Sequence, residues 1–436
     1  MVGFALACTV YTFNQIDVKR NLVSVLAVFI LFLTHAAAQQ VVSSALPTID
    51  LRDWDGATVA PLNGLCMVFD HQLLTPAAVS SSKGRTIDFP GLWPESSETF
   101  GDGYATYALQ VALPPAHRRR LAFSVPQMYS AYRLWANGKL VAANGEVGTS
   151  KETCRAQWLP QTVLLQAAGD TLALVLQIAN FHHAHGGIKE PIYLGTENRM
   201  QAKRTIAVAS NLTEMALLSL LGVFFFVVYK KQPKKRVTRY FAFLCITWAV
   251  RSIFSNLYLV TAWIPAFDWA TQVRIEYLTL YFTVIWAALF LCELFQQEAN
   301  RLIRGFIVGA NILFIAITLL LAPRWFTQWL NIYLTVAGLL LLYGGITVIR
   351  AWAHERVGSG LLTISLVLGL NIFGYDIFVY EGFSSYDPII FNFGYLLIFL
   401  LVAVSLSMHL NLIKSKRPPS NSLSYDDLYR KDPETR

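Results

Sequence analysis

The sequence predicts a multidomain membrane protein in which an N-terminal all-β sandwich is followed by an all-α bundle of seven transmembrane helices. Two observations carry this prediction. Apolar runs follow one another through the second half of the chain, and most reach the roughly 20 residues that a helix needs to cross a bilayer. The first half instead contains short β-rich runs punctuated by glycine, proline and asparagine.

Residues 1–38 are predicted to be a signal peptide. Lys19 and Arg20 precede the apolar run 22–33, which is followed by the three alanines 36–38. A positive region, a short apolar stretch and small residues are typical of a secretory signal with cleavage after its last small residue. An uncleaved anchor helix is the alternative. In either case the next domain is exported.

Residues 39–205 form the predicted extracytoplasmic domain. Runs such as Tyr104–Val111 and Leu172–Ile178 are rich in strand-forming residues. Asn137 and Gly138 join two such runs, and both residue types accept the positive φ of a type I′ hairpin turn. Several short strands without a convincing amphipathic helix indicate an antiparallel sandwich.

The region 206–413 carries the predicted membrane helices. The apolar segments lie near 206–229, 240–260, 273–295, 303–322, 329–349, 357–379 and 389–412. Lipid offers no water to backbone groups, so such segments must be helical. A buried core helix explains one apolar run, but not a succession of them.

Charges between the helices predict the orientation. The break at 230–236 is strongly basic, and further Lys and Arg follow the third, fifth and seventh helices. The breaks after the second, fourth and sixth helices contain a single basic residue, Arg324. Because Lys and Arg stay cytoplasmic, the sandwich is expected outside and the C-terminus inside. Tryptophans at the outer helix ends fit an aromatic belt, namely Trp263, Trp269, Trp325 and Trp329.

Composition supports the membrane assignment. Hydrophobic residues make up 55% of the chain and charged residues 14%, far from the average of soluble domains. The net charge of +8 is concentrated in the breaks between helices and forms no basic domain face. Nucleic acid is therefore not an expected partner, whereas the lipid bilayer is.

Motifs in the first half resemble a known family. Residues 132–140 read YRLWANGKL, continue to NGEVG at 144–148, and are followed by QIANFHHAHGGI at 177–188. This succession resembles the bacterial seven-transmembrane receptors with diverse intracellular signalling modules, the DISM receptors. The run 274–277, RIEY, is similar to the start of the family's third helix. The resemblance covers about residues 60–413.

The resemblance implies a function. It implies a galactose-binding-like jelly-roll ectodomain that binds a small, carbohydrate-like ligand or glycan, and a receptor in the bacterial inner (cytoplasmic) membrane. Family members usually continue into a cytoplasmic output domain, whereas 414–436 is polar and expected to be disordered. The signal would then pass to a separate cytoplasmic kinase or cyclase, or the chain is a degenerate receptor. A homodimer is expected by analogy.

Loop residues at the ends of the sandwich are the candidate ligand contacts, because binding residues gather on loops. They are Trp135, Asn137, Asn144, Asn180, His182 and His183. Trp135 as a core residue, and the others as ordinary loop polarity, are the alternatives. Neither a metal site nor a cofactor is expected, since successive histidines on a strand point to opposite faces.

Charged residues within the predicted helices are the second group of candidates. They are Arg251, Arg274, Glu276, Glu293 and Asp376. A charge at the bilayer centre costs roughly 2.5–3.5 kcal/mol, so it should face the bundle interior and have a partner. Our hypothesis pairs Arg251 with Glu276 or Asp376. Asparagines in or near the helices are expected to hydrogen-bond between helices; they are Asn256, Asn311, Asn371 and Asn392.

No enzymatic activity is predicted, since the sequence holds no nucleophile-elbow, zincin or P-loop motif. Export permits a disulfide between Cys66 and Cys154, which the sequence leaves open. Two alternatives to a receptor remain. A glycan-binding scaffold would recruit a neighbouring protein, and a transporter would be expected to show an internal repeat, which we do not find.

Overall fold

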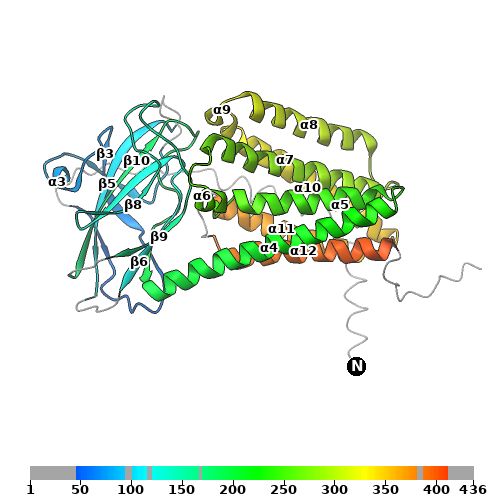
Figure 1. Ribbon diagram of the computed structural model, residues 1–436, viewed down its shortest axis with the longest axis horizontal. Helices are drawn as coiled ribbons and strands as arrows, with labels where there is room; N and C mark the ends of the chain where they lie inside the picture. The colour runs from blue at the N-terminus through cyan, green and yellow to red at the C-terminus, as the bar shows by residue number, and fades with distance from the viewer. Residues whose placement is uncertain (1–45, 94–100, 115–119, 166–168, 381–385, 411–436) are drawn as a thin grey trace, which may run out of the picture. The chain divides into compact units, whose positions relative to one another are not determined.

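The computed structural model describes residues 46–93, 101–114, 120–165, 169–380 and 386–410. The predicted signal peptide and cytoplasmic tail lie outside these residues. Strands occupy the first part of the described chain and long helices the second (Figure 1).

The first part is a β-sandwich, as the sequence predicts. Its strands are β1 (Thr48–Asp50), β2 (Ala60–Pro61), β3 (Gly64–Asp70), β4 (Arg85–Phe89), β5 (Gly103–Ala112), β6 (Leu121–Val125), β7 (Ala131–Ala136), β8 (Lys139–Asn144), β9 (Gln161–Leu165), β10 (Thr171–Asn180) and β11 (Tyr193–Thr196). Within the described residues, one sheet has the order β4-β3-β5-β10-β7-β8, with β1 beside β5, and the other has the order β2-β11-β6-β9. A short helix, α3 (Pro76–Val79), follows β3.

Alternation along the strands builds the core between the sheets. Tyr107, Leu109 and Val111 of β5 are buried in one cluster with Leu121 and Phe123 of β6. Successive side chains of a strand point to opposite faces, so alternate residues of β5 and β6 enter this core. The two sheets are thereby joined by apolar burial.

The predicted hairpin between β7 and β8 is confirmed. Asn137 and Gly138 have φ of 48° and 77°, the left-handed values that a type I′ turn requires. The Asn137 side chain also accepts a hydrogen bond of 2.8 Å from the Ala173 amide of β10. The turn residue is therefore fixed to the neighbouring strand.

The second part consists of helices. They are α4 (Glu197–Lys231), α5 (Arg236–Phe254), α6 (Leu259–Trp263), α7 (Trp269–Leu294), α8 (Arg301–Leu320), α9 (Pro323–Thr327), α10 (Leu330–Ala353), α11 (Ser359–Tyr380) and α12 (Pro388–His409). Within the described residues, 7 of these helices are long and apolar enough to cross a membrane, which matches the predicted number. α6 and α9 are short helices in the connections.

The second membrane helix ends earlier than predicted. Ser255 is extended, and Asn256 and Tyr258 have φ of 58° and 47°. Left-handed residues cannot continue an α-helix. The apolar residues that follow form α6, so the apolar pattern alone overestimated the length of this helix.

The long helices form a ring. α4 packs against α5, α5 against α7, α7 against α10, α10 against α11, α11 against α12, and α12 returns to α4, while α8 packs on α7. Two predicted interhelical asparagine bonds are present: Asn392 donates to Ser210 of α4 over 2.8 Å, and Asn311 accepts from Tyr333 of α10 over 2.9 Å. The prediction is wrong for Asn371, which donates to the Val367 carbonyl of its own helix.

Candidate functional site

The sandwich contacts the helix connections through its loops. The Ala184 amide, in the loop after β10, donates to Thr327 Oγ1 over 3.1 Å. Gln157 donates to the Pro265 carbonyl over 3.2 Å. Asp102 forms an ion pair with Arg324. These contacts reach the connections α6–α7 and α8–α10, on the side that the charge pattern predicts to be outside.

Five aromatic residues form the centre of this contact, which we call the junction cluster: Tyr129, Trp158, His183, Tyr258 and Trp269. Trp158 is 3% exposed, and its ring lies 5.1 Å from that of Tyr258 and 5.5 Å from that of Trp269. Its indole nitrogen donates to the Tyr129 carbonyl. Tyr129 stacks on His183 at 4.8 Å. The cluster therefore joins the sandwich to α6 and α7.

Trp269 departs from the predicted aromatic belt. It is 8% exposed because it packs on Trp158, whereas Trp263, Trp325 and Trp329 are 54%, 55% and 45% exposed. The belt prediction rests on residue type and helix position alone. It could not anticipate that a ring from the sandwich covers one of these tryptophans.

Asn180 organises the histidine loop. Its side-chain nitrogen donates to the carbonyls of Gly101, His183 and His185, and its oxygen accepts from the amides of His182 and His183. Because both of its polar atoms are engaged and it is fully buried, Asn180 shapes the loop. The Nε2 atom of His182 lies 2.8 Å from the Cys154 carbonyl oxygen.

The other sequence candidates are divided between the two ends of β7. Ala131 pairs with Ala179 and Ala136 with Leu174, so Trp135 and Asn137 lie at the end of the strand away from the histidine loop. Asn144 pairs with Tyr132 near the histidine end and donates to the Gln157 carbonyl over 2.9 Å. Trp135 is partly buried against an apolar cluster.

Burial controls the charge of His183. It lowers the pKa of the imidazole to about 3, and the positive charges of His185 and Lys189 act in the same direction. The Nδ1 atom of His183 accepts from the His185 amide over 3.0 Å. The histidine is therefore neutral at physiological pH, and its protonation would remove this acceptor.

The sandwich cysteines are free thiols. Cys66 lies in the main core and Cys154 beside Ser130, and both are buried. Burial raises the pKa of Cys66 to about 12. Among the described residues, no three His, Cys, Asp or Glu side chains are grouped as a metal site requires.

A cavity of about 500 Å³ lies within the ring of helices, and we call it the bundle cavity. Its walls come from α5, α7, α10, α11 and α12, and its sandwich end is lined by Tyr129, Trp158, His183, Lys189 and Glu190. Small-molecule sites usually measure roughly 300–1,000 Å³. The volume therefore falls in the range of a ligand site.

The membrane charges meet at one end of this cavity. Arg251, Glu276 and Asp376 all line it. Arg251 donates over 2.7 Å to the main-chain carbonyl of Glu276, which differs from the hypothesised carboxylate pair. One carboxylate oxygen of Glu276 has no hydrogen-bond donor among the described residues. The sequence hypothesis thus grouped the right residues but assigned the wrong acceptor atom.

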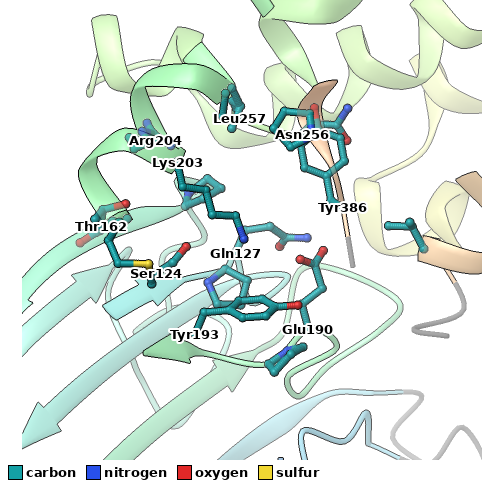
Figure 2. Close-up of a pocket in the computed structure, with 18 of the residues that line it drawn as sticks. Ser124, Gln127, Thr162, Glu190, Tyr193, Lys203, Arg204, Asn256, Leu257 and Tyr386 are labelled. Atoms are coloured by element: carbon teal, nitrogen blue, oxygen red, sulfur yellow. The ribbon is translucent and has the colours of Figure 1, made fainter. Parts of the chain in front are cut away.

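A second, smaller cavity of about 140 Å³ adjoins the first. Both are lined by Gln127, Glu190, Asn256 and Asp376. Figure 2 shows Gln127, Glu190 and Lys203 pointing into the same space. Burial raises the pKa of the Glu190 carboxyl. The two cavities therefore share residues of the sandwich loops and of the helices.

The helices match a known family. Residues 215–411 match the family described as 7TM diverse intracellular signalling. These residues are a DISM seven-helix domain. With this match and its long apolar helices, the chain is a multi-pass membrane protein. No curated protein matches the chain.

Solved structures match the chain only weakly. A putative β-galactosidase from Bacteroides fragilis shares 14% identity over 31% of this chain and 23% of its own, with a TM-score of 0.25. A β-glucuronidase from Faecalibacterium prausnitzii shares 14% identity over 31% of each chain, with a TM-score of 0.23. The chain spans less than a third of these enzymes, so the likeness supports no conclusion about activity.

The remaining charges of the DISM domain have separate roles. Arg274 donates to the carbonyls of Thr318 and Leu321, at the end of α8, where helix carbonyls lack intrahelical partners. Glu293 is half-buried near the end of α7. Glu214 of α4 was not among the residues predicted from the sequence; it is 3% exposed and accepts a hydrogen bond from the Trp248 indole over 2.9 Å. Its acidic side chain inside the first apolar run was the available signal.

Other residues of the site carried no sequence signal. Tyr129, Trp158 and Glu190 line the bundle cavity, but each stands in an ordinary loop context in the sequence. Of the candidate ligand contacts proposed from the sequence, His183 is the one that lines either of the two cavities described here. The site is therefore formed by residues that the fold brings together from distant positions.

Proposed function

We propose that the chain is a non-enzymatic membrane sensor. Its sandwich binds a small ligand of the carbohydrate class outside the membrane, and its seven helices pass the signal to a cytoplasmic signalling protein. The observation that carries this proposal is the junction cluster, in which sandwich loops pack on α6 and α7 and line a cavity that also contains Arg251 and Glu276. A ligand that moves these loops changes the surroundings of the membrane charges.

The proposed orientation places the sandwich in the periplasm and the basic connections in the cytoplasm. Lys234 in the α4–α5 connection and Ala266 in the α6–α7 connection are both exposed, so cysteines introduced there are accessible. In cells whose outer membrane is permeabilised and whose inner membrane is intact, a membrane-impermeant thiol reagent should label Ala266→Cys. It should label Lys234→Cys only after the inner membrane is opened. The reverse order would contradict the orientation.

Ligand binding is tested by thermal unfolding of the full chain in lipid nanodiscs against a panel of sugars and glycan fragments. A ligand at 100 times its dissociation constant stabilises the folded state by about 2.7 kcal/mol. A saturable rise in melting temperature with one sugar class supports the sensor. No rise across the panel would contradict a carbohydrate ligand and would favour the alternative of a scaffold that binds a protein neighbour.

A scaffold and a sensor differ in what happens after binding. A sensor must change the activity of a cytoplasmic kinase or cyclase when the ligand binds, because differential binding to two states shifts their populations. A scaffold binds without such a change. A transporter, the third alternative, would move solute into proteoliposomes, which the sensor does not.

A further inference from the structure

The bundle cavity has a polar end and an apolar body. Glu276 lies in the first turns of α7 and Leu291 near its end, and both line the cavity. Between these residues the wall of α7 consists mainly of Leu280, Val284 and Ala287. The facing wall from α10 and α11 is also largely apolar. The cavity lining on α7 is therefore polar at Glu276 and becomes apolar toward Leu291.

The polar end has an excess of acidic groups. The charged side chains that line the cavity are Arg251, Lys189, Glu190, Glu276 and Asp376. One guanidinium nitrogen of Arg251 donates to the Glu276 carbonyl, while a carboxylate oxygen of Glu276 finds no donor among the described residues. A buried acceptor without a donor is costly. This end therefore favours a ligand group that donates hydrogen bonds and carries positive charge.

Aromatic rings surround the same end. Tyr258, Tyr277, Tyr395 and Trp248 all line the cavity. Ring faces attract cations, and this attraction grows when the site excludes water. An anionic head group would instead meet the carboxyl groups of Glu190, Glu276 and Asp376, which outnumber the cationic side chains Arg251 and Lys189 in the lining.

From these observations we propose that the bundle cavity is a second binding site, for a single-chain amphiphile whose protonated amine lies between Glu276 and Asp376. Its hydrocarbon chain lies along the apolar wall of α7, α10 and α11. The site is separate from the sandwich ligand of the proposed function and does not depend on that ligand's identity. The smaller cavity, which shares Asn256 and Asp376 with the bundle cavity, provides the aqueous path by which the amine enters.

Direct binding tests the head group. The full chain in phosphatidylcholine nanodiscs is titrated with octylamine, octanol and octanoate, with empty nanodiscs as the reference for partition into lipid. Octylamine should bind saturably, and at least tenfold more tightly than octanol or octanoate. Glu276→Gln should weaken octylamine at least tenfold. Glu293→Gln, a change of the same kind on α7 outside the cavity lining, should leave its affinity within twofold.

Two glycines of α11 test the position of the ligand's hydrocarbon chain. Gly369 lines the cavity, and a Cβ there meets only Ile398, at 3.8 Å. A Cβ at Gly374, which is not part of the lining, meets nothing within 4 Å. Gly369→Leu should therefore abolish saturable octylamine binding, whereas Gly374→Leu should preserve it. If Gly369→Leu fails to fold, a shorter amine tests the apolar wall in the wild-type protein. Ethylamine lacks most of the hydrocarbon chain and should bind at least tenfold more weakly than octylamine.

Several results would overturn the proposal. Uptake of octylamine equal to that of empty nanodiscs would show lipid partition only. Octanoate that binds as tightly as octylamine would refute the acidic head-group site. Equal octylamine affinity in the Gly369→Leu and Gly374→Leu variants would show that the hydrocarbon chain of the ligand does not lie against Gly369. Equal affinity for ethylamine and octylamine would show that the hydrocarbon chain does not contribute to binding.

Discussion

Mild acid should weaken the junction between sandwich and helices through His183. Burial lowers the pKa of this imidazole from 6.5 to about 3. Between these values the unfolded chain binds a proton at this position that the folded chain does not, so stability falls as the pH falls below 6.5. At pH 5 the cost is roughly 2 kcal/mol, since each pH unit below the unfolded pKa costs about 1.4 kcal/mol.

The assay compares thermal unfolding of the full chain in nanodiscs at pH 7.5 and pH 5 with that of His183→Asn. Asparagine places its side-chain oxygen near the Nδ1 atom that accepts from the His185 amide, but it does not titrate. Other groups also titrate in this range, and Glu190, whose pKa is raised by burial, acts in the opposite direction. The difference between wild type and variant isolates His183. Equal loss of stability on acidification in both proteins would refute the reasoning.

Three further predictions concern packing and hydrogen bonds. Trp158→Ala should lower the free energy of unfolding by about 3–5 kcal/mol, whereas the exposed Trp263→Ala should change it by less than about 0.5 kcal/mol; chemical denaturation measures both. A double-mutant cycle of Asn392→Ala and Ser210→Ala should give a coupling of about 0.6 kcal/mol, and at most about 1.7, because the two residues share a hydrogen bond. Zero coupling would contradict the bond. Arg274→Gln should cost roughly 1–3 kcal/mol, because charged hydrogen bonds to the end of α8 are lost, and an unchanged melting temperature would contradict that capping role.

Local patterns explain what the sequence predicted well. The membrane helices follow from apolar runs of sufficient length, and the turn at Asn137 and Gly138 follows from the φ preferences of those residues. Both properties depend on residues adjacent in the chain. The early end of α5 was not predicted, because the left-handed conformations of Asn256 and Tyr258 interrupt an apolar pattern that continues through them.

The candidate site was predicted less well because its contacts are distant in sequence. Asn180 was proposed as a ligand contact, but it is occupied by the loop that it holds, including the Gly101 carbonyl. Arg251 was expected to pair with the carboxylate of Glu276 or Asp376, and it donates to the main-chain carbonyl of Glu276. Trp158 contacts Trp269 across more than a hundred residues. Such pairings depend on tertiary packing, which residue type and spacing do not specify.

A ligand that binds the sandwich should change the arrangement of the helices at the other end of the bundle. Lys234 is exposed and Val357 is 49% exposed, and they lie in the α4–α5 and α10–α11 connections, while the native cysteines among the described residues are buried. Spin labels on Lys234→Cys and Val357→Cys report the distance between these connections in nanodiscs. A saturating sugar ligand should shift this distance distribution, and Trp158→Ala should retain binding but lose the shift. A ligand that binds without any change in the distribution would contradict transmission through the helices.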